Sequence, residues 1–122
     1  MTIVSVFLAG GLGSVLRWGV HKALVSFSLE FFWATLVVNI LGSFLLGWCS
    51  VTVLARSDLS QSIQLAIGVG LLGGFTTFST FSLEAVHLLT TQRWGQAIAY
   101  ICLSLFLGIG FALLGIYLGQ ST

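Results

Sequence analysis

One stretch decides how this chain folds: Gly73-Gly74-Phe75-Thr76-Thr77-Phe78-Ser79-Thr80-Phe81-Ser82. It lies inside an apolar run at about residues 63–89 and puts two adjacent glycines and five hydroxyl side chains near the middle of that run. Hydroxyls can bond to carbonyls one turn earlier, but the glycines weaken a helix and favour a break. Backbone groups freed by a break must be buried in protein or line a hydrated cavity. We therefore predict a broken third helix, with a glycine-kinked packing helix as the alternative.

The composition around this stretch excludes a water-soluble domain. Of the 122 residues, 57% are hydrophobic and 6% are charged, whereas soluble domains carry about 25% charged residues. Four Lys and Arg against three Asp and Glu give a net charge of +1, so no basic surface is present for nucleic acid. Cys49 and Cys102 lie in apolar runs without a nearby His/Cys cluster, which argues against disulfide scaffolds and zinc sites.

Four apolar runs are long enough to cross a bilayer, which needs roughly 20 helical residues per crossing. They cover about residues 2–20, 31–54, 63–89 and 95–118, with connections of only a few residues. The first run has no positively charged start and no small-residue cleavage site, so we interpret it as a helix that is not a removable signal peptide. We predict an all-α membrane protein whose single transmembrane domain, residues 1–122, has four helices.

The charges and the small residues both bear on assembly. Arg17, Lys22 and Arg93 fall toward one side of the membrane and Arg56 toward the other, so the bias that usually sets topology is weak and permits insertion both ways. Small residues four apart favour close helix packing; they are Ala9/Gly13, Ser43/Gly47, Gly70/Gly74 and Gly115/Gly119. Because four short helices leave little interior, any solute path needs a second copy of the chain.

A glycine motif just before the break has a different meaning elsewhere. Gly68-Val69-Gly70-Leu71-Leu72-Gly73 matches the G-x-G-x-x-G pattern of dinucleotide-binding loops. That pattern requires a preceding strand, a βαβ unit and an acidic residue about 20 positions further on. None of these can be drawn in this apolar chain, so we reject a nucleotide site.

Phenylalanines alternate with the hydroxyls of the central stretch. Phe75, Phe78 and Phe81 recur every third residue, which predicts that they lie near one another along one side of the helix. Core packing is the usual role of such a stripe. The alternative uses the positive edge of the aromatic ring, which can face an anion and bind it weakly enough to release it, as conduction requires.

Polar side chains in two other runs are candidates for the same path. Asn39 lies well inside the second run, where its amide either bonds to another helix or donates to a dehydrating anion. Tyr100 and Ser104 lie one turn apart in the last run and could extend such a track of donors. A single serine in a membrane helix is weak evidence for this role.

Arg17 and Glu84 are ionisable residues inside the predicted helices, and such residues are functional candidates by default. Arg17 either extends to the interface or raises the anion concentration at a mouth. Glu84 either pairs with His87, three residues on, or interacts with the ion or its proton.

Three motifs taken together resemble the Fluc (CrcB-like) fluoride channels. The motifs are Gly10-Gly11-x-Gly13-x-x-x-Arg17-Trp18, Asn39-x-x-Gly42-Ser43-Phe44 and Gly73-Gly74-Phe75-Thr76-Thr77-Phe78-Ser79-Thr80-Phe81-Ser82-x-Glu84. The resemblance covers essentially the whole chain in length, helix number and motif order. The third motif is the most specific of the three.

The resemblance implies an antiparallel, dual-topology homodimer with two fluoride pores, each lined by both subunits. It implies passive, selective export of fluoride from the cytoplasm across the inner (plasma) membrane of a bacterium. By the family pattern, the fluoride pore is lined by Asn39, Phe78, Phe81, Ser79, Thr80, Tyr100 and Ser104. Arg17 matches a vestibule arginine, and Glu84 matches the acidic residue after the aromatic motif.

The resemblance also implies a structural sodium ion (Na+) on the dimer axis. Its ligands would be the backbone carbonyls of Gly73 and Thr76. A broken helix exposes carbonyl oxygens, and a hard cation accepts oxygen ligands. Two copies of the chain would supply four such oxygens.

Other classes of protein fit the sequence less well. A proton-coupled small-multidrug-type transporter needs a carboxylate in its first helix, and residues 2–20 contain none. A membrane enzyme is not expected, because no Ser/His/Asp set, metal motif or pair of carboxylates at one depth can be assembled. A purely structural membrane subunit would leave the hydroxyl and phenylalanine stretch without a function.

Overall fold

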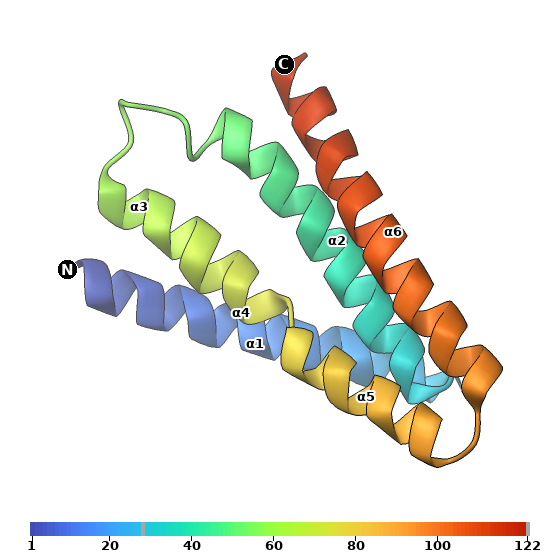
Figure 1. Ribbon diagram of the computed structural model, residues 1–122. Helices are drawn as coiled ribbons and strands as arrows, with labels where there is room; N and C mark the ends of the chain where they lie inside the picture. Colours follow the sequence, from blue (N-terminus) through green and yellow to red (C-terminus); the bar gives the residue numbers. More distant parts are fainter. Residues whose placement is uncertain (28, 122) are drawn as a thin grey trace.

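The computed structural model describes residues 1–27 and 29–121, and every regular element in them is helical (Figure 1). The elements are α1 (Thr2–Ser26), α2 (Phe31–Thr52), α3 (Gln61–Leu65), the π-helix η1 (Ala66–Leu72), α4 (Gly73–Phe75), α5 (Phe78–Thr90) and α6 (Trp94–Gln120). Taken with α3 to α5 as one joined span, four stretches of the described residues are long and apolar enough to cross a membrane. The predicted four-helix, all-α class is confirmed.

The first helix is longer than the hydropathy pattern predicts. We expected it to end near residue 20, whereas α1 continues to Ser26. The reason is that Arg17, His21 and Lys22 mark the edge of the apolar run but do not stop a helix. Lys22 places its ammonium group 5.0 Å from the centre of the Trp18 ring one turn earlier, which favours continuation.

The helices pack as two close pairs, α2 with α6 and α1 with the joined segments α3, η1 and α4 (Figure 1). Small residues allow both contacts. A Cβ atom on Gly115 would lie 2.2 Å from the carbonyl oxygen of Phe44, and one on Gly13 would lie 2.2 Å from that of Leu71. The predicted packing role of these small-residue faces is therefore confirmed.

The G-x-G-x-x-G motif lies within the joined third span and has no strand before it in the described residues. Its first five residues belong to η1, a π-helix of seven residues, and Gly73 begins α4. A Cβ atom on Gly70 would come within 2.9 Å of the Ala9 side chain on α1. Gly70 therefore serves the contact with α1, whereas Gly68 faces the side chain of Leu54.

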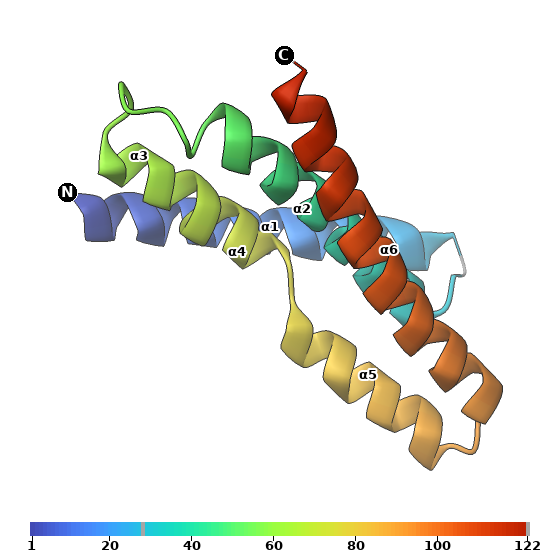
Figure 2. The ribbon, with the colours of Figure 1, turned by 45° about the horizontal axis from the view of Figure 1, so that its top comes forward.

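The third span breaks at the predicted stretch. α4 ends at Phe75, and α5 begins at Phe78. Between them Thr76 and Thr77 have extended backbones, with ψ values of 160° and 118°. Figure 2 shows this connection as a non-helical segment that carries α5 away from the axis of α4.

The buried core lies where α2, α5 and α6 meet. It consists of Phe32, Leu36, Ala85, Leu88, Ala97 and Tyr100. Large apolar side chains elsewhere are exposed, and Phe78 at the break keeps 78% of its surface accessible. Such a surface suits contact with lipid or with another protein chain.

Candidate functional site

Asn39 joins α2 to the break. Its Nδ2 donates to the carbonyl of Thr77 at 2.9 Å, and its Oδ1 accepts from the N–H of Thr77 at 2.8 Å. The side chain thus bonds to both polar groups of the Thr77 backbone, and it replaces the helical partner of the Thr77 N–H. Since the NH₂ group has a second N–H, which no described residue accepts, Asn39 holds the break and keeps one donor free.

Arg17 reaches the same break from α1. Its Nη1 donates to the carbonyl oxygen of Thr76 at 2.9 Å, and its side chain is half-buried. The alternative in which Arg17 extends to the membrane interface is therefore not what the structure has. The two extended residues are therefore each held by one side chain: the Arg17 guanidinium bonds to Thr76, and the Asn39 amide bonds to Thr77.

The break also changes the bonding of the Gly73 carbonyl. In a continuous helix this oxygen would accept from the N–H of Thr77, which instead donates to Asn39. Gly73 is exposed, so its carbonyl is available to another ligand. The Thr76 carbonyl accepts from Arg17 and retains a second lone pair.

A cavity of about 460 Å³ lies between α2, the break and α6. Its lining includes the predicted pore residues Asn39, Phe78, Phe81 and Ser104, together with Ser43, Thr76 and Thr77. The hydroxyl of Ser104 is buried and has no hydrogen-bond partner in the structure. No carboxylate of the described residues lines this cavity. The hydroxyls of Thr76 and Thr77 already donate to the Leu72 carbonyl and to Thr80, so the donors left for a ligand are those of Asn39 and the serines.

Two of the three predicted phenylalanines share a face of α5. The rings of Phe78 and Phe81 have centroids 5.6 Å apart, and Phe81 also packs on Tyr100 at 5.2 Å. Phe75 belongs to α4, on the other side of the break. The expected three-ring stripe is therefore wrong for Phe75, because the extended residues interrupt the helical repeat.

Glu84 forms a second polar centre beside the first. Its carboxylate is buried and accepts from Thr35 Oγ1 at 2.9 Å and from Tyr100 Oη at 2.7 Å. The alternative pairing with His87 is wrong: the His87 ring packs edge-on against Phe31, 5.5 Å away. Thr35 was not predicted from the sequence, although it lies one helical turn before Asn39 and so shares its side of α2.

The remaining predicted hydroxyls do not all face one space. Thr80 lines a separate cavity of about 270 Å³ with Arg17 and Thr35. Ser79 is exposed and lies outside both cavities, with its hydroxyl 3.4 Å from that of Thr77. Thr77 caps α5, since its Oγ1 accepts from the N–H of Thr80 at 3.2 Å.

Several of the predicted site residues are linked to one another by contacts. Thr35 touches both the Arg17 cavity and Glu84, and Tyr100 connects Glu84 to Phe81. Phe81 in turn lines the cavity that holds Asn39 and Ser104. No group of three or more His, Cys, Asp or Glu side chains placed to hold a metal occurs in the described part of the chain.

Comparison with known proteins shows what this chain is similar to. Residues 4–116 match the family described as CrcB-like protein, Camphor Resistance (CrcB). A protein of Thermus thermophilus named fluoride-specific ion channel FluC is 48% identical over 116 residues, 93% of this chain and 91% of its own. A protein of the same name in Saccharophagus degradans is 40% identical over 117 residues, which are 96% of this chain and 88% of its own. One in Phocaeicola vulgatus is 39% identical over 120 residues, 98% of each chain.

The relatives' names describe channels and no enzymatic activity. The family match spans nearly the whole length of the chain, including α1, the break and α6. This chain is a multi-pass membrane protein that belongs to the CrcB-like family.

Proposed function

We propose that this protein is a fluoride-selective channel. The observation that carries the proposal is the 460 Å³ cavity at the helix break, whose lining includes Asn39, Ser104 and the paired rings of Phe78 and Phe81. One N–H of Asn39 and the buried hydroxyl of Ser104 have no partner among the described residues. Unpaired donors in an apolar lining are costly unless an acceptor occupies the space. A small anion is such an acceptor, and relatives named fluoride-specific channels identify fluoride as the ion.

Arg17, Thr80 and Glu84 extend the proposed ion path on the other side of the core. Arg17 raises the local anion concentration at the mouth of its cavity, and Thr80 offers a hydroxyl there. Glu84 is held by Thr35 and Tyr100, so its charge is partly offset by two donors. Ser79, which lies outside both cavities, has a place on the path only through contact with a second chain.

The channel is proposed to be an antiparallel homodimer with two pores, each lined by both subunits. In one chain Phe78 is 78% exposed although its ring lines the cavity, so a second copy is needed to enclose the ion. The weak charge bias, with three cations toward one side and one toward the other, permits insertion in both orientations.

The carbonyls of Gly73 and Thr76 fit the proposed sodium site. Gly73 is exposed and has lost its helical donor, and the Thr76 carbonyl has one lone pair beyond its bond to Arg17. Two copies would provide four neutral oxygens, the type of ligand that hard cations take. The ion would supply positive charge between the two broken helices.

Passive export follows from the chemistry of fluoride. In acidic surroundings fluoride enters a cell as neutral HF, dissociates, and is trapped as the anion. A channel in the bacterial inner (plasma) membrane then lets the anion leave down its gradient. This lowers the cytoplasmic fluoride concentration without an energy source.

Efflux from liposomes tests the proposal. Purified protein is reconstituted into vesicles loaded with potassium fluoride, valinomycin is added to carry the potassium charge, and a fluoride electrode follows release. A matched set of vesicles holds potassium chloride. We expect rapid fluoride release and no chloride release, whereas absence of fluoride release from folded, reconstituted protein would overturn the function.

A further inference from the structure

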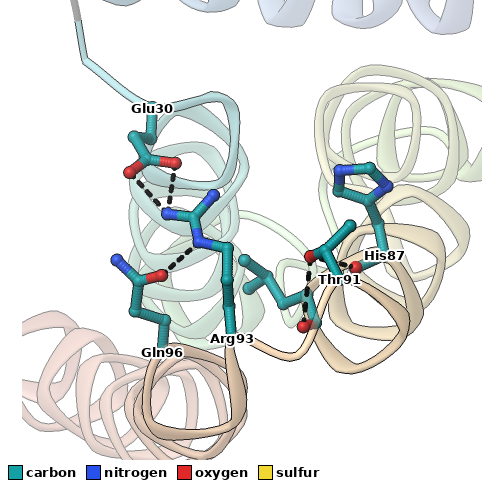
Figure 3. Close-up of polar contacts among 6 residues, drawn as sticks. Glu30, His87, Thr91, Arg93 and Gln96 are labelled. Carbon is teal, nitrogen blue, oxygen red and sulfur yellow. Dashed lines mark hydrogen bonds and ion pairs between the residues drawn. The ribbon is translucent and has the colours of Figure 1, made fainter.

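An ion pair joins two loops that are far apart in the sequence. Arg93 Nη2 lies 2.5 Å and 2.6 Å from the two carboxylate oxygens of Glu30, and Arg93 Nε donates to the side-chain oxygen of Gln96 (Figure 3). The side chains of Arg93 and Glu30 are 30% and 43% exposed. The guanidinium is therefore fixed on two sides, unlike a free surface cation.

Both charged residues stand at the start of a long helix. Glu30 immediately precedes α2, and its carbonyl accepts from the N–H of Trp33 at 3.0 Å. Arg93 immediately precedes α6, and its own N–H closes α5 through the carbonyl of Leu88 at 2.9 Å. The pair thus links the start of α2 to the start of α6.

The electrostatics at the two helix ends explain why both charges are needed. The positive end of a helix dipole favours the carboxylate of Glu30 before α2 but disfavours the cation of Arg93 before α6. Glu30 offsets that unfavourable charge at close range. Removal of Glu30 would leave Arg93 free to turn toward the C-terminal end of α5, where Thr91 and His87 lie (Figure 3).

The same two helices carry the donors that hold Glu84. Thr35 follows Glu30 by about one and a half turns on α2, and Tyr100 follows Arg93 by two turns on α6. Their hydroxyls reach the Glu84 carboxylate at 2.9 Å and 2.7 Å. A slip of one residue between the helices, about 1.5 Å, would take one of these bonds out of range.

The closest backbone contacts between α2 and α6, at Gly47 and Gly115, lie toward the other end of the two helices, and packing is less complete beside the ion pair. A cavity of about 150 Å³ lies between the ion pair and the core and is lined by Glu30, Trp33, Gln96, Tyr100 and others. Tyr100 therefore has space on the side that faces the loops. The ion pair is the polar contact that spans this gap.

We infer that Glu30 and Arg93 are a positioning pair that holds the hydroxyl of Tyr100 on Glu84 and thereby sets fluoride flux. The effect on flux rests on the proposed function; the positioning effect does not. The ion pair between Arg56 and Asp58 is a natural control, because its residues lie in one loop and are 57% and 61% exposed. Arg56 lowers the pKa of Asp58 by hydrogen bonding, but the contact joins no two helices.

Fluorine NMR tests the positioning effect directly. The sequence contains two tyrosines, Tyr100 and Tyr117, so protein labelled with 3-fluorotyrosine gives two signals that a Tyr117→Phe variant assigns. We expect Glu30→Gln and Arg93→Gln each to shift the Tyr100 signal. The signal of Tyr117, which is 67% exposed, and both signals of Asp58→Asn should stay in place.

Fluoride efflux from liposomes tests the effect on function. Each single variant should lose about two- to fivefold in rate, and the double variant Glu30→Gln/Arg93→Gln should lose no more, because either change already breaks the pair. An unmoved Tyr100 signal would overturn the positioning role whatever the flux. If the variants move the Tyr100 signal but leave fluoride flux unchanged, the link to conduction is overturned. If the variants move the signal but the wild-type protein itself conducts no fluoride, only the proposed function fails.

Discussion

At the scale of single residues, Asn39 has two tasks, to hold the break and to offer a free donor, and Asn39→Asp weakens both. Asn39→Asp keeps the acceptor for the Thr77 N–H but loses the donor to the Thr77 carbonyl and the N–H free in the cavity. A carboxylate there would also repel an anion. We expect fluoride efflux to fall at least about tenfold, since like charges at short range cost several kcal/mol.

The measurement for Asn39→Asp is electrode-monitored efflux from liposomes, with the fold checked by circular dichroism and gel filtration. If a correctly folded variant releases fluoride at the wild-type rate, Asn39 is not part of the conduction path. Such a result would leave Asn39 as a helix-to-helix contact.

Phe81 is the second residue whose role can be isolated. Its ring contacts both Phe78 and Tyr100, and Phe81→Ile retains apolar volume but removes the positive ring edge. We expect fluoride efflux to fall about tenfold. Phe106→Ile is the matched control, since Phe106 is 71% exposed and lines none of the three cavities. An equal loss of fluoride efflux in both variants would contradict a ring-edge role for Phe81.

Much of the residue-level site could be predicted from the sequence. Asn39, Phe78, Phe81 and Ser104 converge on one cavity, because each is a polar or aromatic residue where a membrane helix would otherwise be aliphatic. Thr35 was missed because a single threonine in an apolar helix is unremarkable until its partner, Glu84, is placed beside it. The pairing of Glu84 across helices could not be read from spacing along one helix.

At the scale of elements, the contact between α2 and α6 depends on the absence of side chains. Gly115→Ala would place a Cβ atom 2.2 Å from the Phe44 carbonyl oxygen, so the helices would have to separate. We expect a loss of about 1–3 kcal/mol in the free energy of unfolding, measured by thermal or denaturant unfolding in detergent.

The control for Gly115→Ala lies on the same helix. A Cβ atom on Gly110 would meet nothing within 4 Å, so Gly110→Ala should be neutral or slightly stabilising through helix propensity. Equal destabilisation by both substitutions would contradict the packing account and indicate a general intolerance of α6.

Element boundaries were less predictable than the elements. The four apolar runs became four spans, but α1 continues past its charged residues to Ser26, because hydropathy marks the edge of lipid and not the end of a helix. The break could be predicted from Gly73, Gly74 and the hydroxyls after them. The π-helix Ala66–Leu72 could not, since the residue pattern of an apolar run does not distinguish a π-helix from an α-helix.

At the scale of the whole molecule, the proposed dual topology predicts two orientations in one membrane. Ser57 is exposed in the loop between α2 and α3 and can be changed to cysteine in a Cys102→Ser background. In intact cells an impermeant thiol reagent should label about half of the molecules, because an antiparallel dimer holds one chain in each orientation and the charge bias is too weak to prevent this. Complete labelling or none would show a single topology and contradict the antiparallel dimer.

The most direct test of the central claim is the reversal potential of current through the reconstituted protein in a planar bilayer. A tenfold fluoride gradient is set across the membrane with equal chloride on both sides and an impermeant anion as balance. The account predicts a reversal shifted by about 59 mV toward the fluoride equilibrium potential, as for passive, selective conduction of a monovalent anion. A reversal near zero, or one that follows a chloride gradient instead, would contradict it.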